Sequence, residues 1–301
     1  MTLPLPEALP ATARSLEDAE AGMPRMSLVE HLVELRGRLV KAALAMLVAM
    51  ILAFVHWAEV KDFVMEPYKD AARAQGLLDA QLSVIDPGDG FLTVMKLCFL
   101  AGFVLASPVV LWQLWQFVAA GLYEKEKRSV RIFFPFGLGL FALGLVTAYL
   151  VLVPFGLSWL IGFNVHSLGA RSDFSISSYT SLCLSLVFGM GLAFQLPLVM
   201  LFLQGAGVVK RATFKKYWRH AVVGAFVLGM VLTADPSPVT QTLMAIPLCG
   251  LYVLGIWGGR FVGVSKERFR WWKAWPLVLG LALFLGLLIY NQQLVAWWNS
   301  L

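Results

Sequence analysis

Long apolar runs separated by short charged segments dominate the pattern of this chain. Seven such runs stand out, at residues 39–58, 91–118, 132–161, 179–203, 221–234, 239–257 and 276–290. A helix needs about 20 apolar residues to cross about 30 Å of hydrocarbon. The runs are continuous and do not alternate with polar residues, which favours transmembrane helices over a β-barrel. The pattern therefore predicts an all-α polytopic membrane protein.

The fifth and sixth runs are unusual. Run 221–234 would form only about 21 Å of helix, which falls short of a bilayer. The turn Asp235-Pro236-Ser237-Pro238 follows it, and Pro247 interrupts the next run. We expect a short helical pair, which is either buried inside the bundle or faces a locally thin membrane. Length alone does not separate these two alternatives.

Composition and charge predict a membrane protein and its orientation in the membrane. The chain is 59% hydrophobic and 14% charged, whereas soluble domains are nearer half apolar and a quarter charged. Nineteen of the 24 Lys and Arg residues lie in four segments, 14–41, 125–131, 210–219 and 260–273. Basic residues concentrate on the cytoplasmic side of membrane proteins, so we place the N-terminus in the cytoplasm. The net charge of +6 then reflects topology and not nucleic-acid binding.

The polar segments divide the chain into three parts. Residues 1–25 carry four acids and lack the apolar core of a signal peptide, so they are predicted to be a disordered cytoplasmic tail. Residues 26–260 form the transmembrane domain, and residues 261–301 a C-terminal extension. The two large external connections, 59–89 and 162–178, are expected to form a cap over the outer face.

Carboxylates gather in two polar segments on the predicted cytoplasmic side. Ser27 and Glu30 fit the capping box of a short helix, and Glu34 and Arg38 have the spacing of an ion pair. Glu126 lies in the charged connection 122–128. The opening helix is either an anchor for the first span or a carboxylate site that meets a cationic ligand together with the second segment.

Little ionisable chemistry lies inside the apolar runs. Gln195 is deep in the fourth run, where its amide either makes a hydrogen bond between helices or marks a site. The four histidines and three cysteines lack metal-binding spacing, and no phosphate loop or nucleophile elbow occurs. We therefore expect no enzyme activity, no catalytic residues, no metal and no cofactor.

Three blocks of residues resemble one family of membrane proteins. They are HLVELRGR at 31–38, the stretch 107–128 with SP, WQF and GLYEKEKR, and the stretch 223–247 with VGAF, LT, QTL and AIP. In order and spacing they resemble TatC, the multi-spanning receptor subunit of the twin-arginine protein translocase. The resemblance implies a cupped bundle of six helices with short fifth and sixth helices and an external cap.

The resemblance also implies a function. It suggests a receptor for the Arg-Arg signal peptides of folded proteins, exported across the bacterial inner membrane with the proton motive force. TatB-like and TatA-like single-span subunits are the implied partners in a hetero-oligomer within the lipid. The implied signal-peptide residues are Glu34, Arg36, Phe117 and Glu126, and further family positions fall on Pro67, Gln195 and Asp235. A secondary transporter of small solutes is the alternative, although no inverted repeat or intramembrane charge supports it.

The chain departs from the family pattern at three places. Gln195 stands where a glutamate is common, and Asp235 lies two residues before the family's acidic position, which is Ser237 here. The third departure is the C-terminal run 276–290, which tryptophans flank on both sides as in interfacial belts. We expect this run to form a seventh helix with an external C-terminus.

Overall fold

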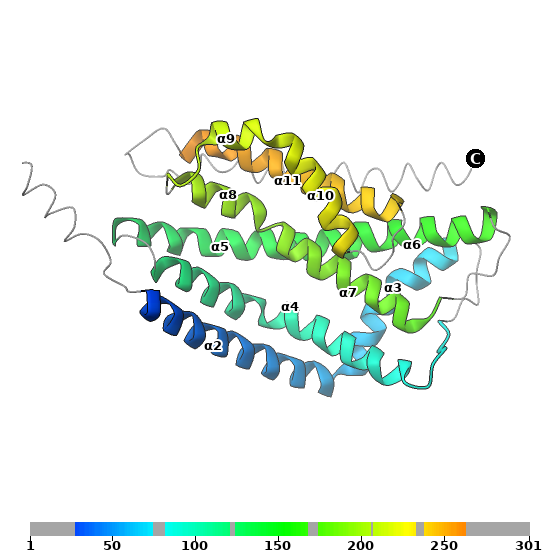
Figure 1. Cartoon of the computed structure of the whole chain (residues 1–301). Coiled ribbons are helices and arrows are strands. Elements are labelled where there is room, and N and C mark those ends of the chain that lie inside the picture. The colour runs from blue at the N-terminus through cyan, green and yellow to red at the C-terminus, as the bar shows by residue number, and fades with distance from the viewer. Residues whose placement is uncertain are drawn as a thin grey trace, which may run out of the picture.

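The computed structural model describes residues 28–74, 82–120, 124–167, 174–205, 207–232 and 238–262. The side chains of residues 124–133 and of residues 28, 74, 166–167, 232, 239–240 and 261–262 are left out. Within these ranges the chain is almost entirely helical, as predicted. The helices form an elongated bundle in which successive long segments run in opposite directions (Figure 1). Five segments are long and apolar enough to cross a membrane, at residues 29–55, 89–120, 134–165, 176–205 and 241–260.

The helices follow the order of the apolar runs. The first half contains α2 (Leu28–Val55), α3 (Trp57–Ala74), α4 (Asp89–Ala120) and α5 (Glu124–Thr147). A π-helical turn, η1 (Ala148–Leu152), links α5 to α6 (Val153–Gly162), and a second π turn, η2 (Phe163–Ser167), follows. The second half contains α7 (Ile176–Ala193), α8 (Leu196–Gly205), α9 (Arg211–Lys216), α10 (Trp218–Leu232) and α11 (Pro238–Val262).

The fifth and sixth membrane helices differ from each other in length. α10 has 15 residues, about 22 Å of helix, so the expectation of a short fifth helix is confirmed. α11 has 25 residues and continues through Pro247, so the sixth helix is longer than expected. Proline is tolerated inside membrane helices that pack on neighbours, and α11 packs along both α8 and α10.

The fourth span is bent in its middle. α7 ends at Ala193 and α8 begins at Leu196, with Phe194 and Gln195 in a turn between them. Pro197 lies just beyond the turn. Its ring crowds the carbonyl of the residue four positions earlier, and proline has no N–H that could donate a hydrogen bond to that carbonyl. The bend places the Gln195 side chain among the neighbouring helices, and α8 then continues beside α11.

A close crossing aligns α2 with α4. A Cβ atom at Gly102 would lie 2.7 Å from the Met50 side chain and 3.0 Å from the Met50 backbone nitrogen. Only glycine fits there, and its absence of a side chain allows the two helices to pack along their length. This contact brings the start of α2 beside the end of α4. Most other apolar side chains of α2 are exposed, as expected for a lipid-facing helix.

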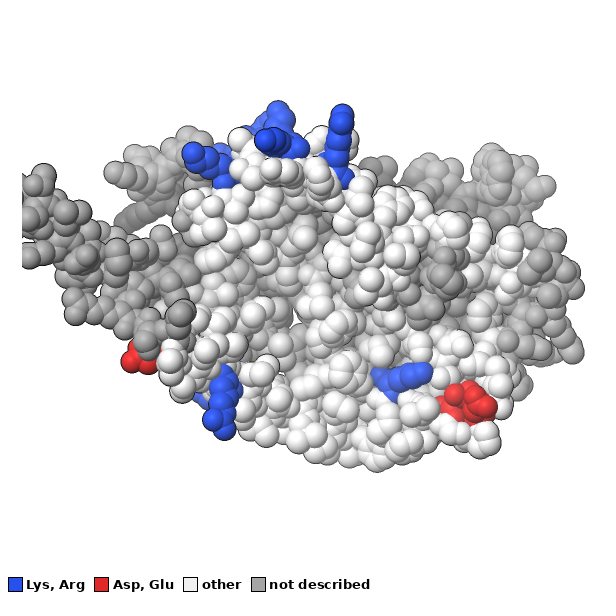
Figure 2. Space-filling view, viewed as in Figure 1, with Lys and Arg blue, Asp and Glu red and all other residues white. Residues whose placement is uncertain are grey.

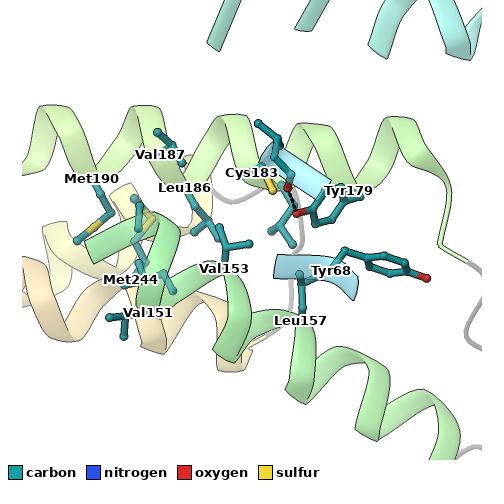
Figure 3. Packing of buried hydrophobic residues seen from close by; sticks show 14 of the residues in the cluster. Tyr68, Val151, Val153, Leu157, Tyr179, Cys183, Leu186, Val187, Met190 and Met244 are labelled. Carbon is teal, nitrogen blue, oxygen red and sulfur yellow. Dashed lines mark hydrogen bonds between the residues drawn. The ribbon is translucent and has the colours of Figure 1, made fainter. Parts of the chain in front are cut away.

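The largest buried cluster lies toward the end of the bundle that carries α3. Tyr68 of α3 packs against Tyr179 of α7, with their ring centroids 5.6 Å apart, and both belong to the cluster in Figure 3. The Tyr179 hydroxyl donates to the Val64 carbonyl, and the Tyr149 hydroxyl donates to the Phe63 carbonyl at 2.6 Å. These bonds fix α3 to α7 and η1 without any charged group.

The two connections that the sequence predicts to be external contact each other. The Ser83 N–H donates to the Phe174 carbonyl at 3.0 Å, and the Ile176 N–H donates to the Ser83 carbonyl at 2.9 Å. Ser83 and Ser175 thereby form an isolated parallel bridge. Together with α3, this bridge covers one end of the bundle, where the sequence predicts a cap.

Candidate functional site

The predicted site residues lie at three levels of the bundle. α2 begins, α4 ends and α5 begins at one end, which we call the α2 end (Figure 1). Glu34, Arg36 and Phe117 belong to these segments. Pro67 is buried in α3 at the opposite end, the α3 end, and Gln195 lies between the two. The structure thus gathers three of the predicted residues and separates the other two from them.

Only one of the two carboxylate oxygens of Glu34 accepts hydrogen bonds from the described residues. The Arg38 Nε donates to Glu34 Oε1 at 3.0 Å, and Arg38 Nη2 bonds the same oxygen. This confirms the ion pair predicted from spacing. The Glu34 side chain is 20% exposed. Its second oxygen, Oε2, is buried and accepts no hydrogen bond from the described part of the chain. One half of the carboxylate is therefore held in place while the other half still has its acceptor capacity.

An aromatic contact joins α2 to α4 beside this carboxylate. The His31 ring stacks on Phe117, with centroids 4.4 Å apart and planes at 23°. His31 lies three residues before Glu34 and so shares its side of the helix. His31 was not among the site residues predicted from the sequence, although its spacing from Glu34 is a signal that could have identified it. Arg36 lies on the same turn and is exposed.

The side chains of two predicted site residues lie outside the part of the chain that the structure describes. Glu126 lies in the first turn of α5, at the α2 end, but its side chain is outside the described residues. Asp235 and the predicted seventh helix also fall outside the described residues. Among the residues that the structure does describe, no group of three or more His, Cys, Asp or Glu side chains is placed to bind a metal.

Gln195 makes a hydrogen bond between helices. Its Nε2 donates to the Gly137 carbonyl of α5 at 2.9 Å. A Cβ atom at Gly137 would lie 3.1 Å from the Trp115 indole nitrogen and 3.3 Å from Gln195 Oε1. The amide, the indole and the glycine backbone thus meet where α4, α5 and α8 converge. Of the two interpretations of Gln195 left open by the sequence, the structure contains the interhelical bond.

Basic side chains gather on one part of the surface. Lys215 and Lys216 of α9 and Arg219 of α10 are exposed, and Figure 2 shows blue atoms grouped over these elements. α9 follows the end of α8, which places this patch at the α2 end. Arg211 is tied down instead, since its Nε donates to the Ile256 carbonyl at 2.9 Å. The α2 end is accordingly the more basic end of the described bundle.

Comparisons with known proteins agree with one another. A family model described as Sec-independent protein translocase protein (TatC) matches residues 30–247. The TatC protein of Helicobacter pylori is 36% identical over 237 residues, which cover 79% of this chain and 90% of the relative. The TatC protein of Aquifex aeolicus is 36% identical over 251 residues, 81% of this chain and 99% of the relative.

The similarity extends to a plastid protein and to a solved structure. The chloroplastic TATC protein of Arabidopsis thaliana is 37% identical over 239 residues, 79% of this chain and 67% of the relative. A crystal structure titled as the twin arginine translocase receptor TatC superposes with a TM-score of 0.70 at 33% identity. It covers 77% of this chain and 99% of the solved chain.

Proposed function

Because the chain belongs to the TatC family of Sec-independent protein translocases, we propose that it is the receptor that binds the Arg-Arg signal peptides of folded proteins for export. The observation that carries the proposal is the Glu34 carboxylate at the α2 end. One of its oxygens is bonded to Arg38, and the other is buried and accepts no hydrogen bond from the residues that the structure describes. The solved relative is described as a twin-arginine translocase receptor, which points to the same ligand chemistry.

The chemistry of Glu34 suits a guanidinium ligand. An unsatisfied buried acceptor costs about 1–3 kcal/mol, and a donor supplied by a ligand recovers this free energy on binding. A guanidinium carries five N–H groups in a planar fork, so it can bond Glu34 Oε2 and still contact a second acceptor. A lysine ammonium is a compact, strongly hydrated point charge and lacks this geometry. The His31–Phe117 stack provides a flat wall beside the carboxylate for the rest of the peptide.

Two arginines call for a second carboxylate, and Glu126 supplies it in this proposal. Glu126 begins α5 at the same end of the bundle as Glu34. Arg36 is exposed on the same turn of α2 and repels any basic segment that approaches in the wrong register. Asp235, Pro67 and Gln195 take supporting roles away from the peptide, with Pro67 in the cap and Gln195 in the bundle interior.

The site is proposed to face the cytoplasm of a bacterium, at its inner membrane. The basic patch at the α2 end supports this orientation. TatB-like and TatA-like single-span subunits are proposed to pack against the apolar outer faces near α10 and Gln195, in a hetero-oligomer powered by the proton motive force. α10 supports this placement, since a helix of 15 residues leaves a shallow hydrophobic flank for a partner helix. The proposal includes no catalytic step, cofactor or nucleic acid.

The test is binding of a twin-arginine signal peptide that carries a photo-crosslinker, against a twin-lysine peptide. We expect Glu34→Ala and Glu126→Ala each to weaken crosslinking by about tenfold or more, because a lost charge-assisted bond costs about 1.5–3 kcal/mol. Glu30→Ala is the matched control, since it removes an exposed acid one turn earlier on α2 and should leave binding unchanged. Equal crosslinking by the Glu34→Ala/Glu126→Ala double variant and the unmodified chain would reject the proposed site.

A further inference from the structure

A lysine reaches into the start of α7 near the α3 end, far from the carboxylate site. Lys96 is the eighth residue of α4, and its Nζ lies 2.9 Å from Ser177 Oγ and 2.8 Å from Ser181 Oγ. α4 has 32 residues, about 48 Å of helix, which exceeds the hydrocarbon thickness of a bilayer. Its first turns therefore extend into the headgroup region, and Lys96 lies near the boundary between headgroups and hydrocarbon.

The same serines line a cavity of about 390 Å³. Ser177, Ser178 and Ser181 of α7 form a polar wall, and Leu157 and Leu160 of α6 form an apolar wall opposite. Binding pockets for small molecules begin at about 300 Å³ and combine apolar lining with a few polar groups. The cavity is thus large enough for a ligand that has one polar end and one apolar end.

Lys96 bonds two of the serines that line this cavity, and no acidic side chain among the described residues pairs with it. The ion pairs within the described residues join other side chains, and none includes Lys96. The three oxygens around the ammonium are two serine hydroxyls and, at 3.5 Å, the Ser177 carbonyl, all of them neutral. They solvate the ammonium but do not neutralise it. A half-buried cation at a membrane boundary is costly unless an anion pairs with it.

The Ser177 hydroxyl is placed to donate a hydrogen bond to such an anion. Ser181 donates its proton to the Ser177 carbonyl at 2.8 Å, so its oxygen is used to hold Lys96. Ser177 accepts from Lys96 and keeps its own hydroxyl proton. Both serines lie in the first turns of α7, an 18-residue helix whose positive end adds to the attraction.

We propose that this cavity binds a phosphate-bearing anion. Its oxygens accept hydrogen bonds from the Lys96 ammonium and the Ser177 hydroxyl, while carbon atoms attached to the phosphate lie against Leu157 and Leu160. Two sources share this chemistry, the headgroup of an anionic phospholipid and free phosphate. The apolar wall favours the phospholipid, because free phosphate has no use for leucine side chains.

The test uses the purified full chain in detergent and follows the midpoint of thermal unfolding. We expect added phosphatidylglycerol to raise the midpoint by several degrees, because a ligand that binds only the folded state stabilises it. Phosphatidylcholine should raise the midpoint less, and inorganic phosphate at constant ionic strength should have little effect. Lys96→Gln keeps an N–H donor for the serines and removes the charge, so it should lose at least half of the phosphatidylglycerol shift.

Lys61→Gln is the matched control. Lys61 also lies near the α3 end, but Asp62 is 3.2 Å away and already pairs with it, so this variant should keep the full shift. A second variant, Leu160→Trp, fills the cavity from the α6 side without touching Lys96 and should lose the shift as Lys96→Gln does. An equal shift for inorganic phosphate would identify free phosphate as the ligand. The proposal fails if the unmodified chain shows no shift, or if Lys96→Gln and Leu160→Trp keep it.

Discussion

Glu34 and Phe117 come together because two helices, and not one, build the site. Arg38 orients the carboxylate from within α2, whereas the aromatic wall needs His31 from α2 and Phe117 from α4. The stack fixes the Phe117 ring against His31, which lies on the same side of α2 as Glu34. In the proposed site, a peptide bound at Glu34 would lie beside this stacked pair, which would limit the residues that can flank its arginines.

We expect His31→Ala to weaken binding of a twin-arginine peptide without unfolding the chain. An aromatic pair contributes about 0.5–1.5 kcal/mol beyond its burial, so its loss should lower affinity by roughly 2- to 10-fold as Phe117 becomes mobile. His31→Phe should restore most of the affinity, since it keeps the stacked ring. The measurement is crosslinking yield against peptide concentration. His56→Ala, at the other end of α2, is the control and should bind normally; normal binding by His31→Ala would remove the wall from the site.

One part of this site was predictable from the sequence and another was not, and the difference has a physical reason. The Glu34–Arg38 pair follows from spacing along a single helix, and it was predictable. The contact between His31 and Phe117 depends on how α2 packs on α4, which is set by the absence of a side chain at Gly102 against Met50. Neither helix alone carries that information. The burial of Glu34 Oε2 is likewise a property of the packed pair and not of the pattern.

At the scale of elements, the length of an apolar run predicted the helix better than the positions of the prolines predicted bends. The short α10 was predictable because polar residues bound its apolar run on both sides. Proline was a less certain guide, since Pro197 accompanies a real bend after Gln195 while Pro247 lies inside the continuous helix α11. The difference lies in the surroundings, because a helix packed on two neighbours tolerates the missing hydrogen bond.

The crossing of α5 and α7 gives a prediction about this packing. A Cβ atom at Gly144 would lie 2.6 Å from the Met190 carbonyl oxygen and 3.0 Å from the Phe194 ring. The carbonyl belongs to the backbone, so Gly144→Ala must push the helices apart, and overpacking of this kind costs about 1–3 kcal/mol. We expect a thermal unfolding midpoint several degrees below that of the unmodified chain.

Gly139→Ala is the control within the same helix. Nothing lies within 4 Å of a Cβ atom at Gly139, so this substitution should leave the midpoint unchanged or raise it slightly, since alanine favours the helix. If Gly144→Ala and Gly139→Ala unfold at the same temperature, the close crossing is not a feature of the folded protein in detergent.

At the scale of the whole molecule, the two ends of the bundle are built differently. The α3 end is closed by α3 and by the Ser83–Ser175 bridge, with buried tyrosines beneath. The α2 end carries the Glu34 carboxylate and the basic patch of α9 and α10. The distribution of Lys and Arg along the sequence predicted which connections share an end, because alternate connections of a helical bundle must lie together. The contact between the two external connections required the folded structure.

This asymmetry predicts the orientation in the membrane, with the α2 end in the cytoplasm. The test is cysteine labelling by a membrane-impermeant maleimide in intact cells. Asp86→Cys lies in the exposed turn before α4 and should be labelled at once, whereas Lys216→Cys lies on the exposed face of α9 and should react only after the membrane is permeabilised. Cys98 and Cys183 are buried, and the partly exposed Cys249 is changed to serine in both variants to keep background labelling low. The reverse pattern would place Glu34 outside the cell, where it cannot meet a signal peptide before export, and would contradict the proposed function together with the orientation.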